Sequence, residues 1–288
     1  MTAIALVARY AIAESVRRRV FVIVLLLTTV FLGLFALGVN EAFEELAEFE
    51  AEGDFGEIPV DERRLAGATL LGLSMFATLF LGAVLGAFLT LSAIRGDAER
   101  GLLQPLVVRP LGRESLLAGR FLAAAAVCAV YAIAVFGGAT LIVGSIGEWW
   151  PDQFVVPALE LAAAVVVITA LSLLGSVFLS ATANGIGVFM LFGAGLVAGL
   201  LGQIGEGLNS PTLIDVGRRT SWALPFEALY QDGLARISSE SLGLTGFVLQ
   251  LGPFGGAQDA GAALVPWTLA YLGVVALVAV VAFRRRDL

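Results

Sequence analysis

Six apolar runs dominate this chain, and each is long enough to cross a bilayer as a single helix. Crossing a hydrocarbon core takes about 20 helical residues, because each residue advances the helix by only about 1.5 Å. The composition agrees, since 59% of the 288 residues are hydrophobic and only 14% are charged. We therefore predict an all-α integral membrane protein with six transmembrane helices, near residues 20–39, 66–94, 120–144, 155–181, 185–203 and 264–283.

The distribution of arginine predicts how these helices cross. Short loops that carry excess Lys or Arg stay on the cytosolic side. If the arginines at 17–19 lie inside, six crossings place both termini in the cytosol, and 12 of the 17 basic residues fall in cytosolic segments. Acidic residues are concentrated in the predicted external segments, with ten carboxylates between residues 40 and 64. Phe43 and Leu46 have helical spacing there, so we expect the first helix to continue outward until Gly53.

Two missing residue types exclude several kinds of chemistry. Every basic residue is an arginine, and histidine is absent. A Walker A phosphate loop needs a lysine, and the common zinc and Ser-His-Asp sites need histidine. The single cysteine, Cys128, lies in an apolar run, which excludes an intrachain disulfide or a CxxC site. We therefore predict no enzymatic activity, no cofactor and no metal site. The acidic composition without lysine is typical of a microbe living in high salt.

One polar segment, residues 95–120, separates the second and third apolar runs and reads RGDAERGLLQPLVVRPLGRESLLAGR. Its five arginines predict a cytosolic position. Pro105 and Pro110 prevent one uninterrupted helix, so we expect the backbone to turn at least once. Composition alone is compatible with a positive-inside loop that only orients the protein.

The spacing within this segment resembles the cytosolic signature of ABC exporter permeases of the type-2 family. That family commonly has a Glu-x-Gly-x-Leu step, then a Pro-x-x-Arg step, then a Gly followed by Lys or Arg. The six-helix layout agrees with the resemblance over the whole chain. The resemblance implies a cytosolic coupling loop that docks on a separate ATP-binding subunit through these residues: Arg95, Asp97, Glu99, Gly101, Leu103, Arg109, Pro110, Arg113, Gly119 and Arg120.

The same resemblance implies the function and the partners. We expect the membrane-spanning subunit of an ATP-driven exporter in a prokaryotic cell membrane, with ATP and Mg²⁺ bound by the ATPase partner. A second permease copy, identical or similar, and membrane lipid are the other expected partners, and no nucleic acid is expected. Permeases of nitrous-oxide-reductase maturation and of multidrug or ion export are similar in layout. The chain has few soft ligands for copper, namely Met1, Met75, Met190 and Cys128, so the substrate stays open.

Two other functions remain open, a non-transporting membrane anchor or assembly factor and an ion-coupled secondary transporter. The second would need carboxylates near the middle of the membrane, and Glu160 is the only acid within the six apolar runs. Because Glu160 follows closely after Pro157, a solvated helix start is favoured over an intramembrane carboxylate. Asn184 is a second candidate intramembrane polar residue, able to bond to a neighbouring helix.

Two small-residue motifs predict close helix packing, Gly82-x-x-x-Gly86 and Gly195-x-x-x-Gly199. Either motif could form a seam that shifts during transport, but ordinary packing within one bundle is favoured.

The two remaining segments lie outside the apolar runs. Residues 1–19 end in basic residues and resemble, by position, the family's interfacial helix. Residues 202–264 are too long for a plain connection, so we predict short re-entrant or surface helices on the external side. Trp222, Phe226 and Tyr230 suit a membrane–water interface. This segment is either an outer gate or a folded cap.

Overall fold

The fold is described from a computed structural model, which places residues 3–17, 19–52, 62–91, 112–238 and 258–285. Within these ranges the chain forms nine helices and no β-strand. In chain order they are α1 (Ala3–Arg17), α2 (Arg19–Glu52), α3 (Glu62–Thr90), α6 (Arg113–Ile146), α7 (Val155–Phe178), α8 (Ala181–Gly207), α9 (Pro211–Ala223), α10 (Pro225–Ser238) and α12 (Leu264–Arg284).

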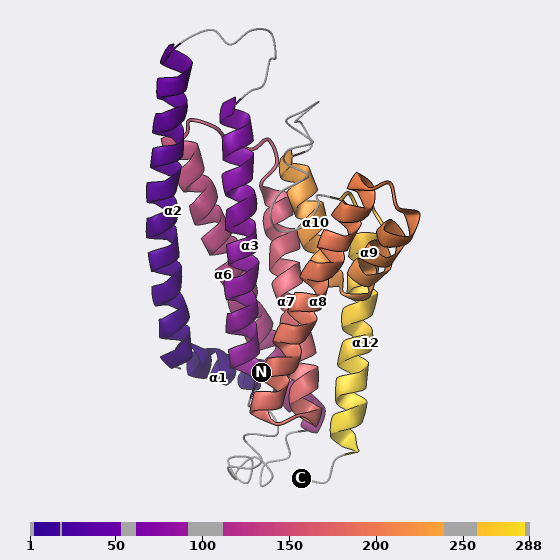
Figure 1. Cartoon of the computed structure of the whole chain (residues 1–288). Helices are drawn as coiled ribbons and strands as arrows, with labels where there is room; N and C mark the ends of the chain where they lie inside the picture. The colour runs from indigo at the N-terminus through magenta and orange to yellow at the C-terminus, as the bar shows by residue number, and fades with distance from the viewer. Residues whose placement is uncertain (1–2, 18, 53–61, 92–111, 239–257, 286–288) are drawn as a thin grey trace.

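Six of these helices, α2, α3, α6, α7, α8 and α12, are long and apolar enough to cross a membrane. They confirm the prediction of an all-α membrane protein with six transmembrane helices. The helices alternate in direction, so that α1 and the end of α12 lie at the same end of the bundle (Figure 1). We call this the terminal end. It also contains the end of α3 and the start of α6, and the other end is named the opposite end.

One helix boundary agrees with the prediction and another differs from it because of a local hydrogen bond. α2 continues to Glu52, as the spacing of Phe43 and Leu46 predicted, and Phe43 is buried. The turn between α7 and α8 lies earlier than predicted, at residues 179–180. Ser180 explains this position, because its side chain accepts a hydrogen bond of 3.4 Å from the backbone N–H of Ala183 and so caps the start of α8.

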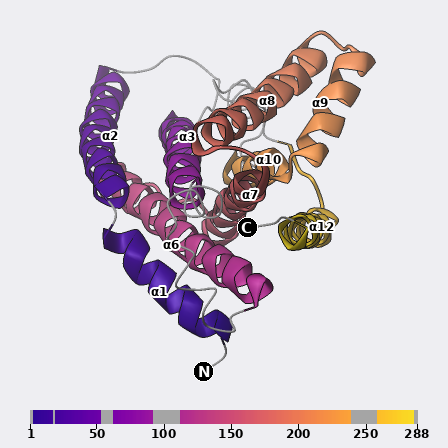
Figure 2. The same ribbon diagram turned by 90° about the horizontal axis from the view of Figure 1, so that it is seen from below.

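The helix α7 lies at the centre of the bundle. It contacts α3, α6, α8, α10 and α12, which surround it when the molecule is seen from below (Figure 2). Its sequence is apolar on every side, which is expected of a helix with no face toward solvent. Leu161, Val165 and Ile168 are accordingly buried. A change in the position of any neighbouring helix therefore has to be accommodated by α7.

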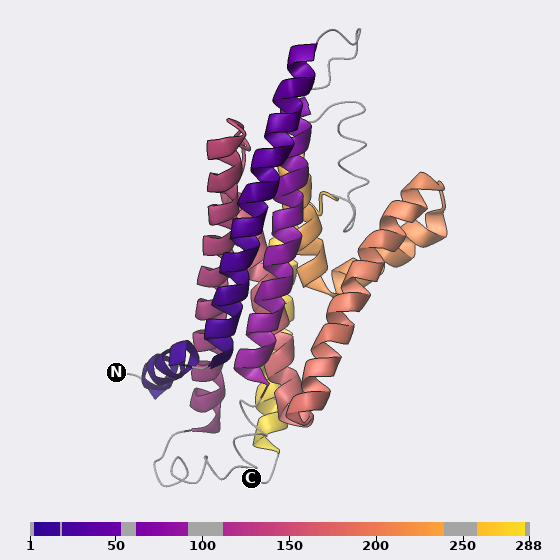
Figure 3. The ribbon, with the colours of Figure 1, turned by 60° about the vertical axis from the view of Figure 1, so that its left-hand side comes forward.

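The helix α1 does not continue the direction of α2. It lies across the terminal end at a steep angle to α2 and packs on α6 (Figures 1 and 3). Leu6 and Tyr10 on α1 are exposed, and Ser15 is buried. The helix therefore buries one side on the bundle and leaves apolar side chains on another.

Two short helices, α9 and α10, fill part of the segment predicted to hold them. α9 folds back on α8 as a hairpin, whereas α10 packs beside α7 (Figure 3). Trp222 and Trp267 pair, with ring centroids 6.4 Å apart. The interfacial position expected for Phe226 and Tyr230 is wrong, since both are only 1% exposed. They belong to the core because α10 inserts its first turns between α7 and α8.

Candidate functional site

The predicted coupling segment joins α3 to α6 at the terminal end. Its residues 92–111 lie outside the described part of the chain, and with them Arg95, Asp97, Glu99, Gly101, Leu103, Arg109 and Pro110. The role assigned to these residues stays a prediction. Arg113 begins α6, and Gly119 and Arg120 follow one to two turns later. The candidate site is therefore built from the helix ends on which this segment is mounted.

The end of α3 is attached to α7 by a buried polar contact. The Oγ1 atom of Thr90, in the last turn of α3, lies 2.6 Å from the hydroxyl oxygen of Ser172 and 2.7 Å from the carbonyl oxygen of Gly86. Asn184, in the first turn of α8, donates through Nδ2 to the carbonyl oxygen of Ser172 at 2.8 Å. Thr90, Ser172 and Asn184 are at most 1% exposed. One residue of α7 thus connects the ends of α3 and α8.

The start of α6 is held by α1. Gly119 faces α1 so closely that a Cβ atom there would lie 2.6 Å from Val7 Cγ1 and 3.1 Å from the carbonyl oxygen of Ile4. Only glycine allows this approach of the two helices. Because α1 rests on the first turns of α6, a displacement of α6 at this end carries α1 with it.

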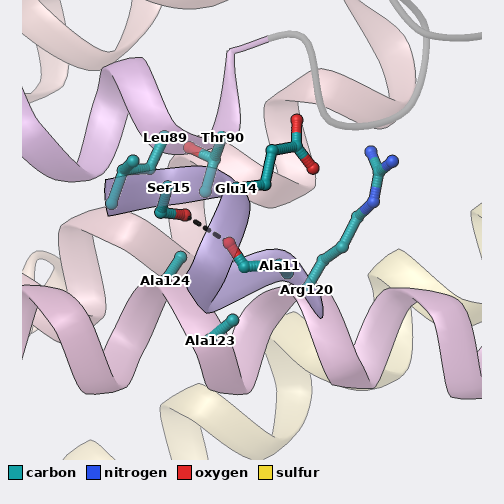
Figure 4. Close-up of a pocket in the computed structure, with 8 residues that line it drawn as sticks. All are labelled: Ala11, Glu14, Ser15, Leu89, Thr90, Arg120, Ala123 and Ala124. Atoms are coloured by element: carbon teal, nitrogen blue, oxygen red, sulfur yellow. Dashed lines mark hydrogen bonds between the residues drawn. The ribbon is translucent and has the colours of Figure 1, made fainter. Parts of the chain in front are cut away.

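Residues of opposite charge from α1 and α6 lie on the same side of a small cavity beside the end of α3. Glu14 and Arg120 line a small cavity together with Ser15 and Thr90, and their charged groups extend toward the same side of it (Figure 4). The Ser15 hydroxyl donates to the Ala11 carbonyl oxygen at 2.7 Å. The cavity has a volume of about 20 Å³, which is room for about one water molecule. Arg120 therefore lies where α1, α3 and α6 converge.

A third connection joins the start of α6 to α12. Glu114, in the first turn of α6, forms an ion pair with Arg284, in the last turn of α12. Both side chains are more than half exposed, so the pair contributes little stability, about 0–1 kcal/mol. Its geometric effect is to place the end of the chain next to the helix that receives the coupling segment.

The helix α3 leaves one narrow apolar face uncovered. Leu73, Phe80 and Phe88 are each 41% exposed and follow a single helical face. Seen from below, α2 and α8 stand apart on either side of α3 (Figure 2). Phe80 also approaches the rings of Phe189 and Phe192 on α8, with centroids 6.5 and 6.0 Å away. Within its membrane span, α3 thus has an exposed apolar face, part of which lies beside α8.

The two glycine motifs face other helices of the same chain. A Cβ atom at Gly82 would lie 2.7 Å from Val165, and one at Gly86 would collide with Thr169, so α3 and α7 are in close contact along this line. At Gly195 a Cβ atom would lie 2.6 Å from the ring of Phe226. At Gly199 it would lie 2.5 Å from Glu227 Oε1 and 2.7 Å from Gln231 Nε2. The first motif receives α7 and the second receives α10.

Glu160 is not at a solvated helix start. Its side chain is 8% exposed, and its Oε1 atom accepts a hydrogen bond of 3.2 Å from Arg236 Nε on α10. Arg236 also bonds to Asp232, at 2.9 Å, and Asp232 accepts the backbone N–H of Ala260 at 2.8 Å. The expectation failed because α10, distant in sequence, covers the start of α7. This buried cluster fixes α10 to α7 and to the chain leading into α12.

Asp232 and Glu227 differ in how their surroundings act on them. Burial alone would raise the pKa of Asp232, but hydrogen bonds from Glu160, the Ala260 N–H and Arg236 outweigh it and hold that pKa below its usual range. Glu227 is fully buried, and among the described residues Gln231 is its one hydrogen-bond partner, at 3.1 Å, while its Oε2 atom has no partner there. Burial raises the pKa of Glu227 to about 8, with the Gln231 hydrogen bond opposing the rise. Glu227 is therefore mostly protonated at neutral pH.

The sequence contained a signal for the buried polar residues of α10, but the apolar pattern around it obscured that signal. Glu227 and Gln231 are four residues apart, as are Asp232 and Arg236, which is the spacing of neighbours on a helix surface. Pro225, just before them, suits the first position of a helix. The burial of that polar face could not be predicted from its own sequence. Burial depends on Gly195 and Gly199 of α8, which leave the space that α10 occupies.

These helices define a multi-pass helical membrane protein. Its buried polar side chains form hydrogen bonds and ion pairs between helices. In the described residues there is no group of three or more His, Cys, Asp or Glu side chains suited to a metal ion. Residues 5–288 match the family model described as ABC-2 family transporter protein. The chain belongs to this family, and it is a membrane permease of an ABC transporter, a transport subunit that is not itself catalytic. No curated protein shows a significant match to the chain.

Proposed function

We propose that this permease is an exporter driven by a separate cytosolic ATPase, which docks on residues 95–120. The observation that carries the proposal is the convergence of α1, α3, α6 and α12 on the two ends of that segment. Without a lysine, the chain has no Walker A loop of its own, so the energy of ATP has to come from a partner. The coupling residues between Arg95 and Arg120 would form the docking surface.

The described contacts supply a route for movement away from this surface. A push on the segment displaces the end of α3 and the start of α6 together. Thr90 passes the displacement to α7 through Ser172, and Asn184 passes it to α8. Close-packed helices change between discrete arrangements rather than bending continuously, so this network favours two states that ATP binding by the partner would interconvert.

The transport pathway would lie between two permease copies, identical or similar. The exposed face of α3 supports this, because Leu73, Phe80 and Phe88 form an apolar surface that a second copy would cover. In this arrangement the terminal end faces the cytosol of a prokaryotic cell. The glycine motifs of α3 and α8 would not form the seam between copies, since they are occupied by α7 and α10.

The orientation can be tested with one introduced cysteine. The native thiol, Cys128, is buried, so a Cys128→Ser background leaves only the new residue to react. A cysteine at Gly101 should react with a membrane-impermeant maleimide in inside-out vesicles and be protected in intact cells. A cysteine at Asp152, an exposed residue of the connection between α6 and α7 at the opposite end, is the matched control and should show the reverse pattern. The opposite result for both would overturn the proposed orientation.

Coupling can be tested with the ATPase encoded nearest to this permease. Co-purification and stimulation of its ATPase activity by the permease distinguish a transporter subunit from a membrane anchor or an ion-driven carrier. Glu99→Arg and Gly101→Pro should keep expression and oligomeric state while abolishing the stimulation. Arg219→Glu, an exposed change on α9 at the opposite end, is the control and should stimulate normally. Parental stimulation in both loop variants would contradict the docking assignment.

A further inference from the structure

Two buried carboxyl groups face each other at the opposite end of the bundle, Glu160 on α7 and Asp232 on α10. Their side chains are 8% and 2% exposed. Arg236 bonds to both, with its Nε atom 3.2 Å from Glu160 Oε1 and 2.9 Å from Asp232 Oδ2. One arginine therefore serves two carboxyl groups. If both groups were ionised, the cluster would hold a net negative charge away from water, which is unfavourable.

The two carboxyl groups differ in their hydrogen-bond donors. Asp232 Oδ1 accepts the backbone N–H of Ala260 at 2.8 Å, and Oδ2 accepts from Arg236. Glu160 Oε1 also accepts from Arg236, but its Oε2 atom is buried and has no hydrogen-bond partner among the described residues. An ionised carboxylate can only accept hydrogen bonds. An ionised Glu160 would therefore keep a buried, unsatisfied oxygen.

A single proton on Glu160 satisfies this oxygen. The protonated carboxyl group becomes a donor, and Asp232 can accept from it because a carboxylate has about four lone-pair sites. The surroundings of Oε2 are otherwise backbone and methyl groups. A Cβ atom at Gly233 would lie 3.3 Å from Glu160 Oε2 and 3.0 Å from Met75 Cε on α3. Asp232 is therefore the partner that a proton on Glu160 would bond to.

The charged groups close enough to act on Glu160, within the described residues, are Asp232 and Arg236 of α10. Asp259, in the chain leading to α12, acts in turn on Arg236. No charged group of α3, α6, α8 or α12 acts on Glu160 in the part of the chain that the structure describes. A second cation that could balance an ionised Glu160 is thus missing from this set.

We propose that Glu160 and Asp232 form a proton-binding site, in which protonated Glu160 donates a hydrogen bond to Asp232 while Arg236 bonds to both. The proton joins three parts of the chain, because Glu160 belongs to α7, Asp232 to α10, and Ala260 to the chain leading to α12. Release of the proton at higher pH replaces the hydrogen bond with repulsion between two carboxylates and loosens α10 from α7. The site does not depend on the ATPase partner, and only its position on the external side rests on the proposed orientation.

The test is infrared spectroscopy of the full-length protein in detergent, where both ends of the molecule meet the same pH. A protonated carboxyl group has a C=O stretching band that an ionised one lacks, and an ordinary glutamate is ionised above about pH 6. Glu160→Gln removes the proposed proton, and Asp232→Asn removes its acceptor. Glu45→Gln, on an exposed surface of α2, is the matched control. Glu227 is present in every variant, so its own proton cancels when each spectrum is subtracted from that of the parent.

Near pH 6 the parent and Glu45→Gln should have one more protonated carboxyl group than Glu160→Gln, and this difference should vanish as the pH rises to about 9. Asp232→Asn should lack the same band, because Arg236 then pairs with an ionised Glu160. Over this range the melting temperature of the parent should fall more than that of Glu160→Gln. Equal bands in the parent and Glu160→Gln would overturn the proposal. So would retention of the band in Asp232→Asn, since burial alone would then hold the proton.

Discussion

Asn184 donates its side-chain amide to the carbonyl oxygen of Ser172 across 2.8 Å, so that the first turn of α8 is bonded to the backbone of α7. The carbonyl at that position belongs to the residue whose hydroxyl meets Thr90 of α3. Gly175 makes the approach possible, because a side chain there would collide with the Asn184 amide. Three transmembrane helices are thereby joined at the end where the coupling segment begins.

Replacing Asn184 with leucine should lower the unfolding free energy by about 1–3 kcal/mol. Leucine has roughly the shape of asparagine but no amide, so the carbonyl oxygen of Ser172 loses this hydrogen bond. The change therefore reports mainly on the polar contact. Thermal unfolding in detergent measures the effect, and ATPase stimulation measures coupling. Asn40→Leu is the control, because Asn40 bonds to Glu44 on an exposed helix surface. An Asn184→Leu protein as stable and as well coupled as the parent would show that the contact does not join the helices.

Gly195→Ala and Gly193→Ala should have opposite effects although both lie on α8. A methyl group at Gly195 meets the buried ring of Phe226, which has little room to move, and overpacking of this kind costs about 1–3 kcal/mol. At Gly193 no atom of the described residues would lie within 4 Å of a new Cβ, so alanine should leave stability unchanged or raise it by up to about 1 kcal/mol through its helix propensity. Melting temperatures of the two variants check this. Equal destabilisation of both would contradict the packing of α10 against α8.

Glu227 should make stability fall as pH rises. Its pKa is about 8 in the folded protein and near 4.5 when exposed, so below the lower value both states hold the proton and there is no penalty. Between the two values the unfolded chain releases its proton while the folded protein retains it, and folding becomes less favourable by about 3–5 kcal/mol in total. Above the higher value the loss is complete.

Comparison with Glu227→Gln isolates this contribution, because glutamine keeps the shape and cannot ionise. The stability of the parent relative to the variant should fall between about pH 4.5 and pH 8. Tyr230, whose pKa is raised first by burial and then by Glu227, is too weak an acid to add to this window. A stability difference that does not change with pH would mean that Glu227 is not the buried neutral acid described above.

Arg236→Met should destabilise the protein more than a surface arginine would. It removes the cation that bonds to Asp232 and Glu160, and about 1–3 kcal/mol is expected, less than for a fully buried pair because the Arg236 side chain is 36% exposed. Arg219→Met, which breaks the exposed pair with Asp215, should cost less than about 1 kcal/mol. Adding Glu160→Gln to Arg236→Met should recover part of the loss. Without that recovery, the two residues are not coupled.

The order and limits of the transmembrane helices could be predicted because they depend on the local sequence. A helix in a membrane satisfies its backbone hydrogen bonds internally, so an apolar run such as 264–283 predicts α12 at nearly its true limits, whatever surrounds it. The turn at residues 179–180 was displaced by only a few residues, and the reason was again local, the cap by Ser180. The predicted coupling residues 95–111 stay a prediction drawn from the resemblance.

The polar clusters could not be predicted in this way. Whether Glu160 meets water or Arg236 depends on where α10 lies, and that position depends on the space left by Gly195 and Gly199. The sequence by itself determined which segments enter the membrane, since the transfer of an apolar residue into lipid depends on its own side chain. Only the tertiary structure decided which charges are buried and which helices are joined, because those energies arise between residues far apart in the chain.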